Sequence, residues 1–196
     1  MTGDQRLARG ARARRTITRH AVDVASVEGL NGLSFGRLAA DLRLSKGGVA
    51  TLFPTKEQLQ LATLETAREM FLEAVVQPAL AAPPGTARLR ALIERWIAYA
   101  EAPLFAGGCI WAANIPDFDS RPGPVRDTLA RQRQAWQTRL AEQLSRAVAN
   151  GEITEVDTEL TAFQIDAVLH AANIAMRLGE SGAAHKVRRV IDGLLA

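Results

Sequence analysis

The stretch that decides the fold is residues 34–53, SFGRLAADLRLSKGGVATLF. It holds two short segments with helical spacing of apolar residues, joined by a turn at Arg43-Leu44. Ser34 and Ser45 are good N-caps, because a serine oxygen accepts a hydrogen bond from a backbone N–H of the first helical turn. We predict two helices, from Phe35 to Leu42 and from Ser45 to about Leu52. This pair is the scaffold of a helix-turn-helix.

The second segment of the pair has an unusual beginning, Ser45-Lys46-Gly47-Gly48. It offers a hydroxyl, an ammonium group and open backbone N–H groups, which suit contacts with phosphates and base edges. Each glycine costs roughly 1 kcal/mol relative to alanine inside a helix. The two glycines are easier to explain where the backbone comes close to another surface. Side chains on both segments are expected to pack together, namely Phe35, Leu38, Ala39 and Leu42 against Leu44, Val49, Leu52 and Phe53.

Around this pair, glycines and prolines divide the chain into further segments with helical periodicity and no strand-like runs. The sequence predicts an all-α protein of about nine helices. Asp157 or Thr158 is expected to cap one of them, and a loop is expected over residues 116–124. The other expected helices cover about residues 16–28, 55–76, 86–102, a short stretch within 107–114, 125–150, 158–178 and 184–195.

The charges are unevenly distributed. Residues 1–60 hold ten Lys/Arg and five Asp/Glu, a net charge of 10 − 5 = +5, and the remainder carries 14 − 16 = −2. A basic end on a near-neutral body is expected where one end meets a polyanion, although a solubilising tail gives the same pattern. We expect a mobile arm that adds nonspecific, salt-sensitive affinity for DNA, formed by Arg6, Arg9, Arg12, Arg14 and Arg15.

Several other classes of protein find little support. No stretch has the roughly 18 uncharged apolar residues of a membrane span, and the N-terminus does not look like a secretory signal. The single cysteine, Cys109, cannot form an internal disulfide, so a cytoplasmic location is expected. Three dispersed histidines favour neither a metal nor a cofactor. Cys109 and His170 are the one candidate nucleophile–base pair, without supporting spacing, so no catalytic site is predicted; a redox-sensing role for Cys109 stays open.

Residues 16–59 resemble the TetR family of transcriptional regulators. That family has an N-terminal three-helix DNA-binding domain, followed by a signature of the type Ser-Lys-Gly, an aromatic-rich turn, Phe-Pro and Lys-Glu. The segments around Gly107-Gly108-Cys109 and 117–125 also look like one branch of the family. The matching residues at the N-terminus are Phe35, Leu38, Ala39, Leu42, Ser45, Lys46, Gly47, Phe53, Pro54, Lys56, Glu57 and Leu59.

The resemblance implies a DNA-binding domain over residues 1–54 and an effector-binding and dimerisation domain over 55–196. Lys56 would contact a phosphate, Arg37 would flank the groove, and Thr51 would face the bases. The chain departs from the family at Ala50, Thr51 and Leu52, where tyrosine and histidine are common. The implied DNA-binding residues are Ser34, Arg37, Ser45, Lys46, Gly47, Gly48, Ala50, Thr51 and Lys56.

The segment 158–178 is apolar on two opposed faces, so it must be covered from both sides. One face carries Leu160, Phe163, Ala167, Ala171, Ile174 and Leu178, and the other carries Ile165, Leu169, Ala172 and Met176. The resemblance implies a homodimer through about 158–178 and 184–195, whereas a monomer that buries the helix completely is the alternative. A polar strip between the two faces is expected to meet solvent, the other subunit or a cavity, and consists of Asp166, His170, Asn173 and Arg177.

The resemblance also suggests a cavity for a small, largely apolar effector, although helical-spaced aromatic residues are usually core. The candidate ligand-binding residues are Trp96, Tyr99, Trp111, Trp136, His170 and Asn173. The sequence therefore predicts a homodimeric repressor that leaves its operator when an effector binds. The alternatives are a helical small-molecule binding protein or enzyme with an incidental helix pair, and a protein-interaction module.

Overall fold

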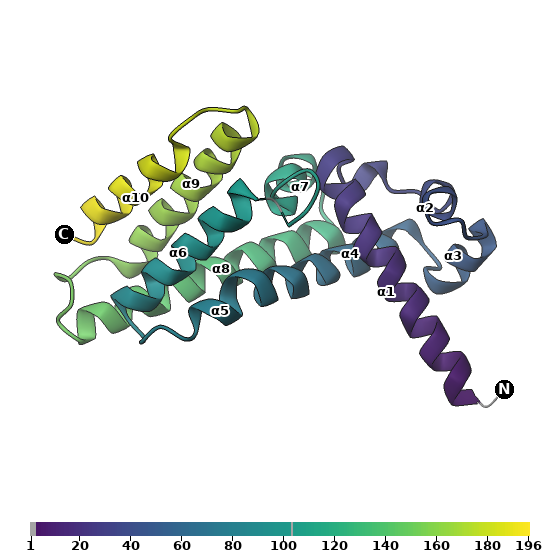
Figure 1. Cartoon of the computed structure of the whole chain (residues 1–196), viewed down its shortest axis with the longest axis horizontal. Coiled ribbons are helices and arrows are strands. Elements are labelled where there is room, and N and C mark those ends of the chain that lie inside the picture. The colour runs from purple at the N-terminus through teal and green to yellow at the C-terminus, as the bar shows by residue number, and fades with distance from the viewer. Residues whose placement is uncertain (1–2, 103) are drawn as a thin grey trace. The chain divides into compact units, whose positions relative to one another are not determined.

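The computed structural model describes residues 3–102 and 104–196, and every regular element in these residues is helical. If α4, η2 and α5 are counted as one continuous run, the described chain holds nine α-helices, so the all-α prediction is confirmed (Figure 1). The elements are α1 (Gly3–Glu28), η1 (Leu30–Gly32), α2 (Phe35–Leu42), α3 (Lys46–Leu52), α4 (Lys56–Phe71), η2 (Leu72–Val76), α5 (Gln77–Ala79), α6 (Thr86–Glu101), α7 (Ile110–Phe118), α8 (Pro124–Ala149), α9 (Thr158–Arg177) and α10 (Ala183–Leu194).

The chain forms two compact units. The first contains the residues up to Met70 together with Phe105–Leu129, and the second contains Phe71–Leu104 with Ala130–Ala196. Helix α7 therefore belongs to the same unit as α1, α2 and α3, although residues 53–109 separate it from α3 in the sequence. The long helix α8 begins in the first unit and ends in the second.

In the first unit, α2 and α3 begin and end where local sequence signals predict. The Ser34 hydroxyl oxygen accepts a hydrogen bond from the Arg37 N–H at 3.1 Å, and the Ser45 oxygen accepts one from Gly48 at 3.0 Å. Between the two helices Arg43 adopts a left-handed conformation with φ 55°, and its N–H and that of Leu44 bond back to the end of α2. These bonds make the tight turn of a helix-turn-helix.

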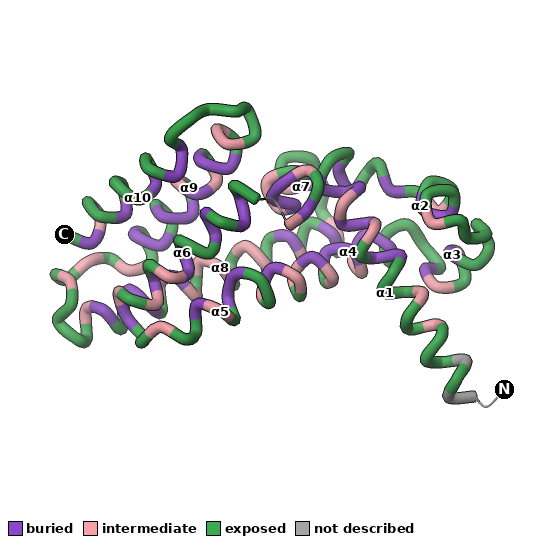
Figure 2. The backbone as a smooth tube through the Cα atoms, in the orientation of Figure 1, coloured by how far each residue is buried: buried purple, intermediate pink, exposed green. Residues whose placement is uncertain are grey.

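Three expectations about the first unit need correction. Helix α1 begins at Gly3 rather than near Thr16, so Arg9, Arg12, Arg14 and Arg15 are exposed residues of a helix rather than parts of a mobile arm. Figure 2 colours much of this stretch as exposed. The Arg6 side chain lies outside the described part. Alanine and arginine are strong helix formers, which explains the extension. Helix α7 continues through Pro116 to Phe118, where a loop was expected. Leu44 is 44% exposed and does not join the core.

The second unit is built on α6, α8, α9 and α10. Helices α9 and α10 pack together across a turn whose Gly179 and Gly182 both have φ 78°. Two ion pairs join α10 to α6, Arg188 to Glu94 at 2.7 Å and Arg90 to Asp192 at 2.6 Å. The aliphatic part of the core between these helices includes Leu89, Leu92, Ile97, Leu140, Leu144, Ile165, Leu169, Val187 and Ile191. Among the described residues, no helix has the length and apolar character required to cross a membrane.

Candidate nucleic-acid interface

The helix-turn-helix is held together by a small apolar core. Leu38 and Ala39 of α2 are buried, as are Val49 of α3 and Phe53 directly after it. Burial of these side chains fixes which face of α3 remains accessible. Of the nine residues predicted to contact DNA, Ala50 is half-buried and the others are exposed: Ser34, Arg37, Ser45, Lys46, Gly47, Gly48, Thr51 and Lys56.

The first turn of α3 is exposed, and its lysine has no ion-pair partner among the described residues. Lys46 forms no ion pair with any described residue and is exposed. A Cβ added to Gly48 would lie 3.0 Å from the Ser45 Oγ, whereas one added to Gly47 would meet nothing within 4 Å. Packing inside the chain therefore favours glycine at 48 and gives no reason for glycine at 47. A close external surface would supply that reason.

Thr51 uses its hydroxyl proton inside α3. Its Oγ1 donates to the Gly47 carbonyl oxygen at 2.9 Å, the bond that threonine often makes to the preceding helical turn. What Thr51 can offer to a partner is therefore its methyl group and the remaining acceptor capacity of its oxygen. A methyl group is suited to contact with the methyl of thymine.

Arg37 is engaged in an ion-pair network between α1 and α2. Its Nε donates to Asp41 Oδ2 at 2.8 Å, and its Nη1 lies 3.2 Å from Glu28. His20 Nε2 of α1 reaches the same Asp41 oxygen at 2.8 Å. The hydrogen bonds from His20 and Arg37 lower the pKa of the Asp41 carboxyl group. The network orients α2 on α1, and about half of the Arg37 side chain stays exposed.

Lys56 is likewise bonded within the chain. Its ammonium group donates to the Asn31 carbonyl oxygen at 2.5 Å, in the turn that follows α1. The neighbouring carbonyl, that of Leu30, accepts a buried hydrogen bond from Gln60 Nε2 at 2.9 Å. Two side chains from the start of α4 therefore hold the turn Leu30–Gly32. Lys56 remains exposed at this position.

The same turn is also bonded to α7, a relationship that sequence reasoning missed. The fully buried Asn114 accepts a hydrogen bond from the Leu30 N–H at 2.5 Å and donates to the Ala25 carbonyl oxygen at 3.1 Å. Just before α7, Gly107 lies against α1, and a Cβ there would be 2.0 Å from the Ser26 carbonyl oxygen. An asparagine between the apolar run Ile110-Trp111-Ala112-Ala113 and Ile115 was the available signal.

Three of the predicted ligand-binding residues, together with Phe71, form an aromatic cluster in the second unit. The ring of Phe71 lies 5.4 Å from those of both Tyr99 and Trp136 in edge-on geometry, and Trp96 lies 6.3 Å from Tyr99. Phe71 was not among the predicted ligand-binding residues. Trp111 lies on α7 and so belongs to the first unit.

The polar strip on α9 is divided: Asp166 and Asn173 are buried in their own unit, His170 is half-buried, and Arg177 is exposed to solvent. Asp166 is 1% exposed and accepts hydrogen bonds from Arg133 Nε at 3.0 Å and Gln137 Nε2 at 2.8 Å, both on α8. His170 lies 3.7 Å from Asp166, and burial lowers the pKa of its imidazole. Asn173 is buried, and its Oδ1, like the Trp136 Nε1, has no hydrogen-bond partner among the described residues.

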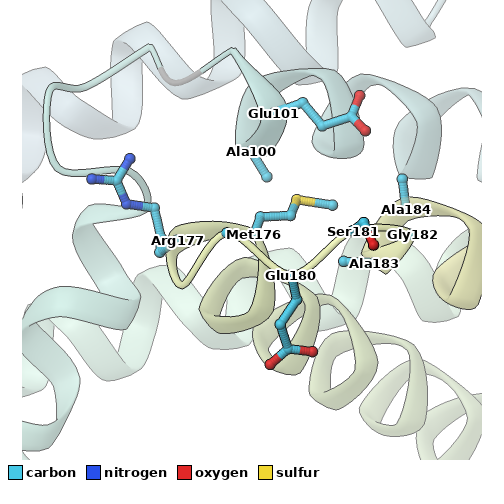
Figure 3. A pocket seen from close by; sticks show the side chains of 10 residues that line it. Ala100, Glu101, Met176, Arg177, Glu180, Ser181, Gly182, Ala183 and Ala184 are labelled. Atoms are coloured by element: carbon cyan, nitrogen blue, oxygen red, sulfur yellow. The ribbon is translucent and has the colours of Figure 1, made fainter.

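A surface pocket of about 440 Å³ lies beside the turn between α9 and α10 (Figure 3). Met176 projects into it near Ala100, and Glu101 and Glu180 stand at its edges. Its lining includes none of the six predicted ligand-binding residues.

Cys109 is buried at the start of α7. Among the described residues, no group of three or more His, Cys, Asp or Glu is arranged to hold a metal ion.

Comparison with solved structures places the whole fold in a known group. A TetR transcriptional regulator from Chloroflexus aurantiacus J-10-FL matches with a TM-score of 0.84 and 26% sequence identity, over 96% of this chain and 94% of that one. A putative transcriptional regulator from Saccharomonospora viridis, solved with choline, matches at TM-score 0.79 and 18% identity over 93% and 95% of the two chains. AibR, solved with isovaleryl coenzyme A and operator DNA, matches at 0.69 and 22% over 86% and 96%.

The sequence itself supports the same assignment. The family model for the tetracyclin repressor-like C-terminal domain matches residues 85–191, which is more than half of the chain. No curated protein sequence matches the chain. Members of this family are DNA-binding regulators rather than enzymes. The resemblance seen at residues 16–59 is confirmed: the chain belongs to the TetR family of DNA-binding transcriptional regulators.

Proposed function

We propose that this regulator is a homodimeric repressor that reads its operator with α3 and leaves it when a small, largely apolar effector binds. In this proposal residues 1–54 bind DNA, and residues 55–196 bind the effector and form the dimer. The dimer, the DNA contact and the effector site each rest on a different feature of the described residues.

The main observation in favour of a dimer is an exposed apolar stripe on α9. Leu160, Phe163, Ile174 and Leu178 are 54%, 53%, 57% and 75% exposed, while Ile165, Leu169 and Ala172 on the opposed face are buried. A single chain therefore covers one apolar face of α9 and leaves the other in water. Exposed apolar faces of this kind mark interaction surfaces, and a second copy related by a two-fold axis presents the same face.

The first turn of α3 supports the proposal that this helix contacts DNA. Lys46 is exposed and free of ion pairs with the described residues, and the space beside Gly47 is open. A phosphate group would meet an ammonium group and backbone N–H groups there. Thr51, one helical turn further on, would present its methyl group to a base. Ala50 and Thr51 offer few side-chain hydrogen-bonding groups to the bases, which implies that DNA shape and phosphate contacts carry much of the affinity for the operator.

The effector site is supported by the aromatic cluster around Phe71. Trp136 Nε1 is a buried donor and Asn173 Oδ1 a buried acceptor, both without partners among the described residues. Buried polar groups left unpaired cost free energy, and a ligand with one polar group could recover it. The relatives solved with choline and with isovaleryl coenzyme A hold ligands of quite different chemistry. Such variety fits a site whose apolar walls change from member to member.

The route from effector to DNA would pass through α7. This helix sits in the first unit on α1, and the chain on both sides of Phe105–Leu129 belongs to the second unit. A change in the second unit would therefore reach α1 and the turn Leu30–Gly32 through Asn114. For the equilibrium to shift, the effector must bind one of the two arrangements more tightly.

Selection of bound duplexes from a random DNA pool, followed by gel-shift titration at increasing salt, tests the DNA-binding part. We expect one enriched sequence with two related half-sites, and weaker binding by Lys46→Ala and Thr51→Ala. Glu155→Ala, on an exposed residue outside the helix-turn-helix, serves as the control. An enriched sequence whose binding is unaffected by both α3 variants would contradict the role of α3.

A further inference from the structure

Arg14, in the N-terminal half of α1, contacts the end of α3 in two ways. Its Nη1 donates a hydrogen bond to the Leu52 carbonyl oxygen at 2.8 Å. Its guanidinium carbon also lies 4.5 Å from the centre of the Phe53 ring, in cation–π geometry. Leu52 is the last residue of α3, so Arg14 joins two elements that are 38 residues apart in sequence.

Helix α3 depends on such external contacts. It has seven residues, two of which are glycines, and a helix this short and glycine-rich is not stable alone. Its beginning is secured by the Ser45 cap and its middle by the buried Val49. The carbonyl groups of its last turn have no partner within the helix. A guanidinium at that end satisfies one of them and lies where the helix dipole favours a cation.

The other exposed arginines of α1 differ from Arg14. Successive residues of a helix are rotated by about 100°. Arg15 and Arg12 therefore point well away from the direction in which Arg14 meets Leu52. Both are exposed, and neither forms an ion pair with a described residue. Of these three arginines, Arg14 alone contacts α3 through a hydrogen bond and a ring stack.

We propose that Arg14 is a positioning residue, which fixes the C-terminal end of α3 against α1 and so sets the angle at which α3 meets DNA. The proposal rests on the proposed function, in which α3 reads the operator. The arginines in the N-terminal half of α1 then have two separable roles: Arg14 orients α3, and Arg12 and Arg15 supply positive charge.

The test compares Arg14→Ala with Arg15→Ala, which removes the same charge from the same helix. Hydrogen exchange of the α3 amides is measured in the free protein. Affinities are then measured for the selected operator duplex and for a shuffled duplex of equal length. Arg14→Lys keeps the charge but not the planar group that stacks on Phe53. It also keeps the test usable if Arg14→Ala folds poorly.

Arg14→Ala should speed exchange over residues 49–53 and lower operator affinity about tenfold more than shuffled-duplex affinity. Arg14→Lys should fall between this variant and the natural protein. Arg15→Ala should leave exchange unchanged and weaken both duplexes by the same factor, as expected for the loss of one charge. Equal behaviour of Arg14→Ala and Arg15→Ala in both measurements would overturn the proposal. If Arg14→Ala speeds exchange over residues 49–53 but leaves the ratio of operator to shuffled-duplex affinity unchanged, then Arg14 does fix the end of α3. That result would instead contradict the proposal that α3 reads the operator.

Discussion

The side-chain oxygen of Asn114 accepts a hydrogen bond from the backbone N–H of Leu30 at 2.5 Å, joining α7 to the turn that follows α1. The same asparagine donates to the Ala25 and Ile110 carbonyl oxygens. All of these groups are buried, so water cannot replace a lost partner. Asn114 is therefore both a structural requirement of the first unit and the point at which α7 is bonded to α1 and to the turn Leu30–Gly32.

Asn114→Ala should lower the free energy of unfolding by about 2 kcal/mol, because it leaves the buried Leu30 N–H without an acceptor. Urea denaturation followed by circular dichroism measures this change. The control is Asn31→Ala, which removes an exposed 3.3 Å contact with Asp117 in the same region and should cost under about 0.5 kcal/mol. Equal losses in the two variants would show that burial of the Asn114 bonds is not what stabilises the unit.

Gly47→Ala separates folding from DNA binding. A Cβ at position 47 has open space, and alanine favours a helix over glycine, so stability should stay the same or rise by up to about 1 kcal/mol. Operator affinity should nevertheless fall several-fold, because the methyl group would occupy the space in which DNA approaches α3. Gel-shift titration measures the affinity. Gly10→Ala, also in open space on a helix, is the control. Undiminished affinity for Gly47→Ala would mean that DNA does not approach the helix there.

His170 should make stability depend on pH. Burial lowers the pKa of its imidazole, outweighing the attraction of Asp166 and acting in the same direction as the repulsion from Arg133. The unfolded chain therefore takes up a proton first as the pH falls through about 6.5, and the folded state loses stability below that pH. Between pH 7.5 and 5.5 the melting temperature of the natural protein should fall further than that of His170→Gln. Parallel decreases would show that His170 does not titrate differently in the two states.

Ile174→Glu should disrupt the dimer. Ile174 lies in the exposed stripe of α9, and a charge there would be buried without a partner at a two-fold interface. We expect the dissociation constant of the dimer to rise at least about 30-fold in sedimentation equilibrium. Leu80→Glu, at an exposed apolar residue after α5, should leave it unchanged. Either a natural protein that sediments as a monomer or an Ile174→Glu variant that stays dimeric would refute this interface.

Local signals in the sequence predict much of the fold. The caps at Ser34, Ser45 and Asp157 were predictable because each depends on bonds within three residues. The opposed faces of α9 follow from helical periodicity alone. The early start of α1 was missed because residues 3–15 have no apolar stripe, although their alanines and arginines favour a helix.

The contacts that organise the candidate site could not be predicted in this way. Asn114 meets Leu30 across 84 residues, and Arg14 meets Leu52 across 38. Arg14 does not differ in type from the arginines beside it, and the polar Asn114 in an apolar stretch does not reveal its partner, so only the packing of α7 and α3 on α1 identifies these contacts. For the same reason, Arg37 and Lys56 look like free cations in the sequence, although both bond to oxygen atoms within the first unit.

Hydroxyl-radical footprinting on the selected duplex tests the central claim most directly, because it reports DNA contact and dimer geometry together. A dimer that presents two copies of α3 should protect two patches about one helical turn, roughly 34 Å, apart. Lys46→Ala should weaken both patches equally. A single protected patch would contradict the two-fold reading of the operator, and uniform protection without patches would contradict sequence-specific binding by α3.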